Sequence, residues 1–400
     1  MDKMALSKKV MRVQPSATLA MAAKTKAMLA KGADVINLSL GEPDFTTPTA
    51  IESAAIDAIR SGKTSFYTPA GGLPELKQAI AQRVAADTGV KYQAKQIIAT
   101  TGAKFALYLI FQVILNAGDE VLLPAPFWVS YAEQVKLAGG RPLLVHPTGE
   151  NGKVTVADLE MVRTPQTQAL VINSPQNPTG AIYTASELTA LGHWAASHDI
   201  LLIADEIYSH LVYNGNQFTS VIQLDQTIRD NTLLVSGLSK TYAMTGWRLG
   251  YVLGNAGIIQ AMTTVASHAT GNPTAVSQYA AIAALNGDQS AAEAMRLSFE
   301  QRLNYLFPKI QSLSGFELPT KPQGAFYLFP NVKRAVVRCG YTTTEDFVTD
   351  LLTQAYVAVV PGRAFGQPDY IRISYAASET QLAEAYQRMA EFLRTKGNPD

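Results

Sequence analysis

The chain has 400 residues, of which 47% are apolar and only 16% are charged. This length predicts two domains with a large buried core, and the composition excludes disorder or a coiled coil as a description of the whole chain. Because 33 basic and 32 acidic residues leave a formal charge of +1, the chain lacks the overall basic field that drives nucleic-acid binding. We therefore expect no nucleic-acid partner.

The N-terminus and the cysteine content bear on location. Residues 1–14 lack the apolar stretch of a signal peptide, and the longest apolar stretch, residues 106–115, is too short to span a bilayer. The one cysteine, Cys339, excludes an intramolecular disulfide and a cysteine-cluster metal site. The sequence thus predicts a cytoplasmic protein that does not associate with membranes.

Short apolar runs alternate with helical patterns through the middle of the chain. Runs typical of buried strands lie at residues 96–101, 120–124, 169–173, 200–204, 232–236 and 248–253. A helix is predicted over residues 74–87, which open with a proline in the first turn. Another is predicted to run to His198, because Thr184 and Glu187 form a capping box at its start. This alternation predicts an α/β fold with a mostly parallel sheet and helices on both faces.

The two ends of the chain differ from this alternation. From residue 290 or so onward, helical patterns mix with short strands at residues 325–329, 358–360 and 371–374. The N-terminal segment also stands apart. We interpret residues 47–285 as a large domain, and residues 1–46 together with residues 286–400 as a smaller α+β domain.

Two long segments carry no Asp, Glu, Lys or Arg: residues 164–186, 23 in all, and residues 249–287, 39 in all. A solvent-exposed surface rarely leaves so long a segment uncharged. Burial in the core explains such a segment, and so does a subunit interface, whose centre is depleted in charge. Both explanations stay open, and they can hold together.

Several familiar motifs are missing. The segment Gly62-Lys63-Thr64 is similar to the end of a phosphate-binding loop, but Asp57 stands where that loop needs its first glycine. Neither a G-x-G-x-x-G nor a G-x-S-x-G sequence is present. The five histidines are scattered and form no H-E-x-x-H sequence. We therefore expect no metal centre.

Chemically active side chains follow the predicted strands at their carboxyl ends, where open α/β sheets bind ligands. The segments are residues 101–104 (TGAK), 124–128 (PAPFW), 173–180 (NSPQNPTG), 205–208 (DEIY) and 236–240 (SGLSK). Arg248 follows eight residues after the last of them. We expect these segments to form one binding site.

Two charged positions in that set stand in otherwise uncharged sequence. Lys240 is the only charged residue in the stretch 231–247; burial at a strand end lowers the pKa of a lysine, which can then act as a nucleophile or move a proton. Asp205 and Glu206 are the only carboxylates in the stretch 200–224, and a buried carboxylate needs hydrogen bonds or a cation such as a pyridinium nitrogen. From each residue alone, a solvent-reaching or ion-paired lysine and a turn-capping aspartate stay open.

Anion-binding groups occur in the same segments. Gly102, Ala103 and Lys104 open a predicted helix, whose free N–H groups and positive dipole end suit a phosphate. Arg248 and the Ser239 hydroxyl can add contacts to that phosphate.

Two further residues suit a planar ring. Trp128 can stack on it, although a lone tryptophan also fits a core. Asn177 can donate to a ring oxygen, although its N-P-T-G sequence also fits a tight turn. Taken together, the set describes a pocket for a planar, phosphorylated aldehyde with a cationic ring and a lysine to condense with it, and that description matches pyridoxal 5′-phosphate.

These residues lie in segments that resemble the fold-type I pyridoxal-phosphate aminotransferases of class I, in their bacterial aspartate aminotransferase branch. The resemblance extends nearly from end to end, and the spacing from Lys240 to Arg248 with the sequence M-T-G-W-R is highly specific. The matching segments are residues 15–18 (PSAT), 40–45 (LGEPDF), 67–71 (YTPAG), 173–180, 205–208, 239–240, 243–248 (AMTGWR), 359–362 (VVPG) and 371–375 (IRISY).

The resemblance implies a role for each residue of the site. Lys240 condenses with the cofactor and moves a proton, Asp205 pairs with the pyridinium nitrogen, and Tyr208 binds the phenolic oxygen. The remaining implied cofactor contacts come from Asn177, Trp128, Gly102, Ala103, Lys104, Ser239, Arg248 and, across a homodimer interface, Tyr67 of the partner subunit.

The same resemblance implies how substrate binds. Arg372 holds the α-carboxylate as a bidentate fork, beside Trp128 and with help from Asn177 and the backbone of Gly41. Lys104 matches a lysine that meets the distal carboxylate of acidic substrates, which favours aspartate and glutamate; alternatively it only adds charge near the phosphate. Aromatic amino acids and alanine stay open as substrates.

The chain departs from the family pattern at two positions. Gly237 stands three residues before Lys240, where many members carry serine, so that one phosphate hydroxyl is missing or Ser236 supplies it. Tyr131 stands where better-known aspartate aminotransferases carry a histidine beside the ring-pairing aspartate. Support for Asp205 must therefore differ in detail.

We expect a homodimeric aminotransferase that passes the amino group of aspartate to 2-oxoglutarate with ping-pong kinetics. A β-lyase stays open as an alternative, because the same lysine, aspartate and arginine serve that reaction. A non-enzymatic binding module is disfavoured, because no basic N-terminal helix-turn-helix region is present and the catalytic residues are intact.

Overall fold

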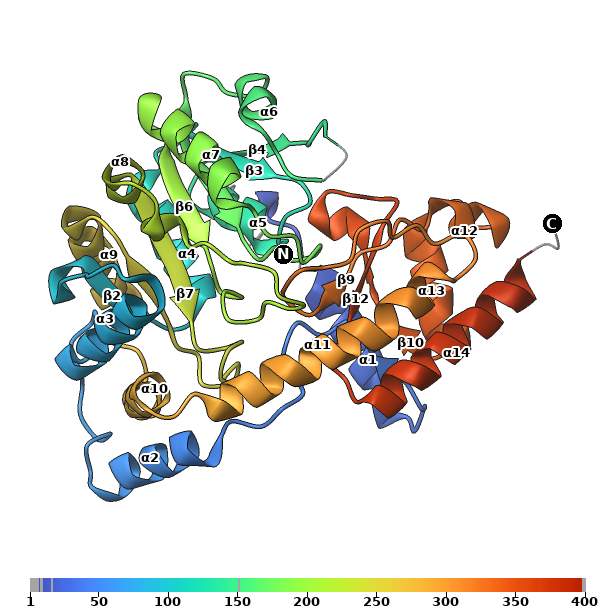
Figure 1. Ribbon diagram of the computed structural model, residues 1–400, viewed down its shortest axis with the longest axis horizontal. Helices are drawn as coiled ribbons and strands as arrows, with labels where there is room; N and C mark the ends of the chain where they lie inside the picture. The colour runs from blue at the N-terminus through green and yellow to red at the C-terminus, as the bar shows by residue number, and fades with distance from the viewer. Residues whose placement is uncertain (1–6, 8–9, 16, 150–151, 398–400) are drawn as a thin grey trace, which may run out of the picture.

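Two lobes make up the part of the chain that the computed structural model describes, which is residues 7, 10–15, 17–149 and 152–397. Figure 1 shows the sheet of the larger lobe on one side and a smaller lobe on the other, with helix α11 (Ser290–Gln311) running between them. Ser16, from the matched segment 15–18, lies outside the described residues.

The larger lobe is built on a seven-stranded sheet in the order β2-β8-β7-β6-β5-β3-β4. Its strands are β2 (Ile97–Thr100), β3 (Glu120–Pro124), β4 (Arg141–Val145), β5 (Thr167–Asn173), β6 (Leu201–Asp205), β7 (Thr232–Gly237) and β8 (Gly250–Leu253). In this sheet β8 runs antiparallel to both neighbours, and the pairs from β7 to β4 are parallel. The predicted α/β fold with a mostly parallel sheet is confirmed.

The strands predicted for this sheet match the observed ones to within one or two residues at each end. In the smaller lobe, the single strand predicted at residues 358–360 is instead two short strands, Val357–Ala358 and Val360–Pro361, with different partners. The sequence does not predict β4, because this edge strand lacks the pattern of a buried run. Arg141 and Leu144 are exposed, and only Val145 is buried. The run R-P-L-L-V therefore shows neither continuous burial nor strict alternation.

Helices cover both faces of the sheet. They are α2 (Thr49–Arg60), α3 (Pro74–Thr88), α4 (Ala103–Ile114), α5 (Ser130–Leu137), α6 (Val156–Glu160), α7 (Ala185–Ser197), α8 (Gln226–Asp230), α9 (Ala256–Ala269) and α10 (Ala275–Asn286). Neighbouring strand residues face opposite layers, as the two-residue period of a strand requires. Val121 packs with α4, α5 and α9, and Leu122 packs with α6, α7 and α8.

The two helices predicted from their starts are present. Pro74 occupies the first turn of α3, which ends at Thr88. At α7 the Thr184 side chain accepts the Glu187 N–H, and the Glu187 carboxylate accepts the Thr184 N–H. This helix ends at Ser197, one residue before His198.

The smaller lobe joins the two ends of the chain. β1 (Ile36–Asn37) pairs in parallel with β10 (Val357–Ala358), and a three-stranded antiparallel sheet has the order β11-β12-β9. The other elements are α1 (Ala17–Ala30), β9 (Tyr327–Leu328), α12 (Lys333–Arg338), α13 (Thr344–Gln354), β11 (Val360–Pro361), β12 (Ile371–Ser374) and α14 (Glu379–Lys396). The expected α+β architecture is confirmed, and the boundaries after residues 46 and 285 stay a prediction.

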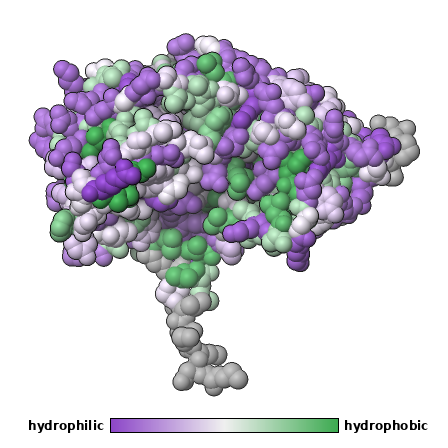
Figure 2. Space-filling model, turned by 90° about the horizontal axis from the view of Figure 1, so that it is seen from below, coloured by the Kyte–Doolittle hydropathy of each residue, from purple (hydrophilic) through white to green (hydrophobic). Residues whose placement is uncertain are grey.

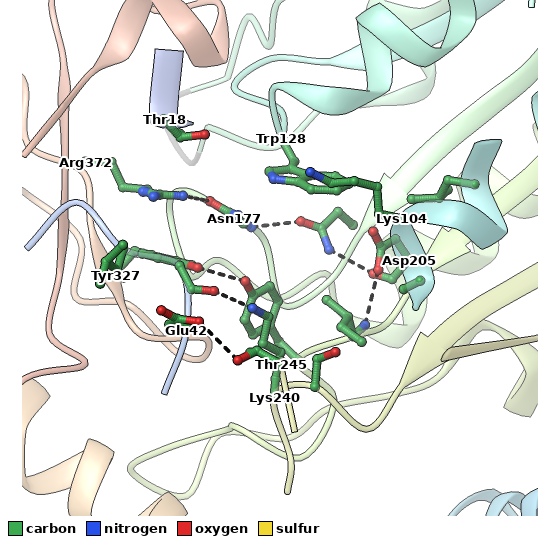
Figure 3. Close-up of a pocket in the computed structure, with 18 of the residues that line it drawn as sticks. Thr18, Glu42, Lys104, Trp128, Asn177, Asp205, Lys240, Thr245, Tyr327 and Arg372 are labelled. Atoms are coloured by element: carbon green, nitrogen blue, oxygen red, sulfur yellow. Dashed lines mark hydrogen bonds between the residues drawn. The ribbon is translucent and has the colours of Figure 1, made fainter. Parts of the chain in front are cut away.

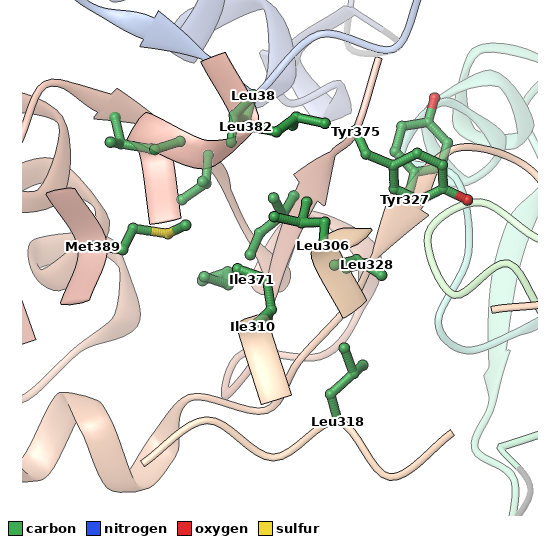
Figure 4. Packing of buried hydrophobic residues seen from close by; sticks show 14 of the residues in the cluster. Leu38, Leu306, Ile310, Leu318, Tyr327, Leu328, Ile371, Tyr375, Leu382 and Met389 are labelled. Atoms are coloured by element: carbon green, nitrogen blue, oxygen red, sulfur yellow. The ribbon is translucent and has the colours of Figure 1, made fainter. Parts of the chain in front are cut away.

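One apolar cluster holds this lobe together. Leu38 from the N-terminal segment packs with residues of α11, β12 and α14, among them Leu306, Ile371 and Leu382 (Figure 4). Such packing removes their side chains from water, which is the main force that keeps the N-terminal segment beside the C-terminal third.

The two uncharged segments have different surroundings. Residues 164–186 consist mostly of β5 and the buried turn after it, so burial accounts for their composition. Residues 249–287 include α9, whose exposed side chains at Gln260, Thr264 and Ser267 are uncharged. Figure 2 shows apolar side chains in small groups among polar ones on one face of the molecule. No helix among the described residues is long and apolar enough to cross a membrane.

Candidate active site

A cavity of about 570 Å³ lies at the carboxyl ends of the central strands, between the two lobes. In Figure 3, Lys104, Trp128 and Asp205 lie on one side of it, and Tyr327 and Arg372 lie on the other. The sequence-predicted residues that line it are Gly41, Ala103, Lys104, Trp128, Asn177, Asp205, Tyr208, Ser239, Lys240, Arg248 and Arg372. Gly102 lies directly behind Arg248, and Tyr67 lies away from the cavity.

Lys240 lies in the turn that follows β7 and is partly buried. Its Nζ donates a hydrogen bond to the carbonyl oxygen of Gly41. Burial lowers the pKa of Lys240 to about 7, and the carboxylate of Glu42 opposes this shift. A large share of the amine is therefore neutral near pH 7, which is the form that acts as a nucleophile or accepts a proton.

Asp205 ends β6 and is only 3% exposed. Its Oδ2 accepts a 2.6 Å hydrogen bond from the Tyr131 hydroxyl, and its Oδ1 accepts one from the Ile207 N–H at 3.3 Å. Burial raises the pKa of Asp205 to about 6, against the effect of the Tyr131 hydrogen bond. The residue thus caps a local turn and also offers the cavity a carboxylate that a cationic partner would keep ionised.

The neighbouring carboxylate does not take part in the cavity. Glu206 accepts hydrogen bonds from the Ser220 hydroxyl at 2.6 Å and from the Val221 N–H at 2.8 Å. Of the two adjacent carboxylates, only Asp205, the one to which the family resemblance gives a role, lines the cavity.

Helix α4 begins at Ala103, on the wall of the cavity. Its N-cap, Gly102, has φ +81°, and a Cβ at this position would lie 2.4 Å from Nη2 of Arg248. Only a glycine therefore lets this guanidinium approach the free N–H groups of the helix start. The side chain of Arg248 is held by a 2.7 Å hydrogen bond from Nη1 to the Thr245 carbonyl.

The departure at Gly237 has a steric cause. A Cβ there would lie 2.9 Å from the Cα of Gly250 and 2.9 Å from the Leu249 carbonyl oxygen, so β7 and β8 leave no room for a side chain. Ser236 does not line the cavity and instead lies opposite Tyr251 of the neighbouring strand β8. Ser239, which is buried and lines the cavity, remains the hydroxyl available to an anion.

Arg372 is 2% exposed and lies between two aromatic rings, with its Cζ 4.4 Å from the Tyr327 centroid and 5.1 Å from that of Phe365. Its Nη2 donates to the Ser39 carbonyl at 2.8 Å, and its Nη1 donates to Oδ1 of Asn177 at 3.1 Å. Its buried Nε has no partner among the described residues. A buried guanidinium with spare donors suits a carboxylate.

The overall charge of the cavity points to anionic ligands. Its lining includes four basic side chains and two acidic ones, Glu42 and Asp205. Lys104 extends with its Nζ 4.9 Å from the ring centroid of Trp128. Burial and the nearby Arg248 lower the pKa of Lys104. The excess of positive charge fits a phosphate and carboxylates bound together.

The sequence analysis misses part of the lining. Tyr327 is fully buried in β9, and its hydroxyl lies 2.8 Å from that of Tyr208. Thr18, Leu19 and Ala22 of α1 also border the cavity. A tyrosine within the apolar run A-F-Y-L-F is the one sequence signal for Tyr327, because a buried hydroxyl needs a partner.

Comparison with known proteins agrees with this geometry. A family model described as aminotransferase class I and II matches residues 33–389. An aspartate aminotransferase of Bacillus sp. (strain YM-2) is 50% identical over 390 residues, which are 97% of this chain and 99% of that protein. An asparagine–oxo-acid transaminase of Streptococcus mutans is 49% identical over 389 residues, which are 97% of this chain and 99% of that protein.

Solved structures show the same similarity. The aspartate aminotransferase from Rhizobium meliloti superposes with a TM-score of 0.92 at 37% identity, over 98% of this chain and 100% of that one. The aspartate aminotransferase from Thermus thermophilus with maleate has a TM-score of 0.91 at 38% identity, over 97% of this chain and 99% of that one.

Proposed function

The chain belongs to the class I and II aminotransferase family and is a transaminase, and we propose that it moves the amino group of L-aspartate to 2-oxoglutarate with pyridoxal 5′-phosphate as its cofactor. One observation carries this proposal: a single cavity brings the amine of Lys240, the carboxylate of Asp205 and the guanidinium of Arg372 together. The three groups suit an aldehyde, a ring cation and an α-carboxylate.

The cavity suits the cofactor in its donors and charges. Asp205 would pair with the ring nitrogen, and the start of α4 with Ser239 and Arg248 would hold the phosphate. The deprotonated ring oxygen would face Tyr208 and Asn177, and Trp128 would cover the ring. Once bound, the cofactor supplies an electron sink for the α-carbon of the substrate.

The chain's own groups would handle the proton and the substrate. Arg372 would bind the α-carboxylate through its guanidinium. This group is buried and is held in place by hydrogen bonds to Asn177 and to the Ser39 carbonyl. This grip fixes the α-carbon of the substrate relative to the Lys240 amine, which accepts a proton from that carbon and later returns one. A pKa of Lys240 of about 7 allows both steps near neutral pH.

Aspartate is the proposed donor because Lys104 extends a second cation into the cavity. Several relatives at about half identity are named aspartate aminotransferases, which agrees with this choice. The Streptococcus mutans relative, named for asparagine, makes asparagine the second candidate donor. Lys104 would favour aspartate over asparagine, since it meets a charge in one and a neutral amide in the other.

We further propose a homodimer in which Tyr67 of one subunit reaches the phosphate bound by the other. Tyr67 and its neighbour Phe66 are 99% and 79% exposed on the single chain. The outer side of α9 carries no Asp, Glu, Lys or Arg, and the centre of a subunit interface is likewise depleted in these residues. Sedimentation tests this arrangement, and a fully active monomer would contradict it. For the Tyr67→Phe variant, we expect weaker binding of the cofactor, and a sedimenting mass that is still that of the dimer.

The test of the proposed function is an absorption spectrum of the purified protein with added pyridoxal 5′-phosphate, followed by aspartate. We expect a visible band that aspartate converts to the shorter-wavelength band of the pyridoxamine form. The Lys240→Ala variant should lack the starting band. If cofactor gives no band, the proposal is wrong; if aspartate leaves the band unchanged, asparagine, aromatic amino acids and alanine become the donors to test.

Kinetics then separate transfer from elimination. Transamination predicts parallel initial-velocity lines when aspartate and 2-oxoglutarate are both varied. Pyruvate and ammonia released from a β-substituted amino acid without any 2-oxo acid would indicate a β-lyase instead.

A further inference from the structure

Tyr327 contacts both ends of the cavity through different parts of its side chain. Its ring lies against the guanidinium of Arg372, 4.4 Å from centroid to Cζ. Its hydroxyl lies 2.8 Å from the hydroxyl of Tyr208. Both tyrosines are buried, and they come from opposite lobes, β9 in one and the loop after β6 in the other. Figure 3 shows Tyr327 beside Arg372.

The surroundings leave Tyr327 little freedom. Its ring also packs against Phe326, with centroids 4.7 Å apart. A Cβ at Gly41 would lie only 3.0 Å from the Tyr327 oxygen, so the glycine leaves the space that this hydroxyl fills. The hydroxyl is therefore directed to Tyr208 by steric contacts as well as by the hydrogen bond.

The pair of hydroxyls has a preferred direction. A hydroxyl carries a single hydrogen, so Tyr208 can donate either to Tyr327 or to a ligand in the cavity. The Arg372 guanidinium lies against the ring of Tyr327, with Cζ 4.4 Å from the centroid, and its charge opposes the rise that burial causes in the pKa of this phenol. A deprotonated ring oxygen can only accept, so with the cofactor bound the hydrogen of Tyr208 goes to that oxygen, and the Tyr208 oxygen is left to accept the hydrogen bond that Tyr327 donates.

We propose that Tyr327 is a positioning residue with two separable tasks. Its ring holds the Arg372 guanidinium in place for the substrate α-carboxylate. Its hydroxyl donates to Tyr208, so that the hydrogen of Tyr208 is left for the deprotonated ring oxygen of the cofactor. The inference rests on the proposed function, because it takes pyridoxal 5′-phosphate as the ligand that Tyr208 meets.

The hydroxyl task is tested by the pH midpoint of the visible band of the lysine-bound cofactor. A donor at the ring oxygen disperses negative charge, and a weaker donor leaves the neighbouring lysine nitrogen with a higher proton affinity. We expect Tyr327→Phe to move the midpoint upward by roughly 0.2–0.6 of a pH unit, because chained hydrogen bonds strengthen one another only moderately. Tyr208→Phe should move it further in the same direction.

A double variant distinguishes this task from a structural role. In the Tyr208→Phe background, Tyr327→Phe should cause no further shift, because the receiving hydroxyl is already gone. The matched control is Tyr375→Phe, which removes another buried hydroxyl of the same lobe, one that donates to the Ala325 carbonyl at 3.2 Å outside the cavity. We expect this control to leave the midpoint unchanged.

The ring task is tested by the dissociation constant of maleate, a dicarboxylate, for the holoenzyme. Tyr327→Phe keeps the ring and should leave that constant within about twofold of wild type, whereas Tyr327→Leu should weaken binding roughly tenfold by removing a desolvated cation–π contact. If Tyr327→Leu does not fold, Tyr327→Met replaces it at similar length, and thermal unfolding confirms that each variant used is folded.

Three results would overturn the inference. The first is a wild-type midpoint in Tyr327→Phe. The second is that adding Tyr327→Phe to Tyr208→Phe shifts the midpoint as much as Tyr327→Phe does alone. The third is tight maleate binding by the folded Leu or Met variant. Each leaves the visible band and its response to aspartate intact. Failure of the proposed function differs, because the wild-type protein itself then shows no band.

Discussion

The side of the cavity built by the sheet and the side built by the smaller lobe hold their charges in different ways. On the sheet side, Asp205 ends one buried strand and Lys240 follows another, and burial moves the pKa of Lys240 to about 7 and that of Asp205 to about 6. On the other side, the guanidinium of Arg372 is held between two aromatic rings, those of Tyr327 and Phe365. The sheet side therefore sets the protonation states of its two residues, whereas the smaller lobe sets the position of its guanidinium.

The largest expected effect comes from removing the amine of Lys240, whose pKa is lowered by burial. Lys240→Ala should lower turnover of aspartate by about 10⁴-fold, because proton transfer by a placed base contributes up to that factor. Single-turnover absorbance after addition of aspartate measures it. Lys77→Ala is the control, since Lys77 is also partly buried, with its pKa lowered by burial, but lies outside the cavity. Retained turnover in Lys240→Ala would show that another group moves the proton.

The next effect comes from keeping the charge of Arg372 while changing its shape. Arg372→Lys should lower kcat/KM for aspartate roughly 100-fold, because a lysine cannot make the two parallel hydrogen bonds to a carboxylate. The visible cofactor band should stay. Steady-state kinetics with aspartate decide the matter.

Arg302→Lys is the matched control for that change. Arg302 also makes a bidentate contact, to Asp44 at 2.6 and 3.0 Å, and lies against the rings of Phe45 and Phe299. It lies outside the cavity lining, so we expect a lower melting temperature with KM for aspartate nearly unchanged. Equal kinetic losses in both variants would mean that Arg372 acts through stability alone.

A substitution of Lys104 tests whether the sheet side of the cavity also binds the distal carboxylate of the substrate. Lys104→Gln should raise KM for aspartate about tenfold, the value of one hydrogen bond to a charged group, and leave KM for alanine unchanged. Comparing the two amino acids provides an internal control. Lys63→Gln, outside the cavity, should change neither value. Equal rises for both amino acids would place Lys104 at the phosphate instead.

The smallest effect concerns the ionisation of Asp205. Loss of the Tyr131 hydroxyl in Tyr131→Phe removes a donor that favours the carboxylate, so the pKa of Asp205 should rise by roughly 0.4–1 unit. The carboxylate exists only above its pKa, and the acid limit of cofactor binding should therefore move to higher pH. Measurement of the cofactor dissociation constant from pH 5 to 8 detects the shift.

Tyr183→Phe is the control for that shift. Tyr183 is equally buried, but its hydroxyl accepts from the Val154 N–H and does not line the cavity. The acid limit should stay at its wild-type pH in this variant. An unchanged limit in Tyr131→Phe would mean that the Ile207 N–H alone supports Asp205.

The comparison of the two sides also explains what the sequence could predict. Lys240, Asp205 and the start of α4 lie at the ends of buried strands of four to six residues, and such apolar runs are visible in a sequence. Because parallel strands end at one edge of a sheet, the residues after them can be placed together from the sequence alone.

The smaller lobe carries a weaker signal. Its strands at residues 325–329 and 371–374 are predicted, but they pair antiparallel, so their ends do not meet at one edge of the sheet and the residues on them cannot be placed together from the sequence. Tyr327 lies in a strand of two residues, and α1 lies against the cavity through contacts between the two ends of the chain. Arg372 is identified from the family resemblance alone, since nothing in a single sequence separates it from other arginines. The domain boundaries, the role of Tyr67 and a cytoplasmic location stay predictions.

The close approach of β7 and β8 restricts how this chain could evolve. A side chain at Gly237 would collide with Gly250, and a side chain at Gly250 would come within 2.3 Å of the Ala103 nitrogen. Gly250 of β8 lies directly against the start of α4, so a shift of β8 at this point would disturb that helix start. A serine at position 237 is therefore closed to this lineage as a single substitution, and could be gained only after changes elsewhere had separated the two backbones.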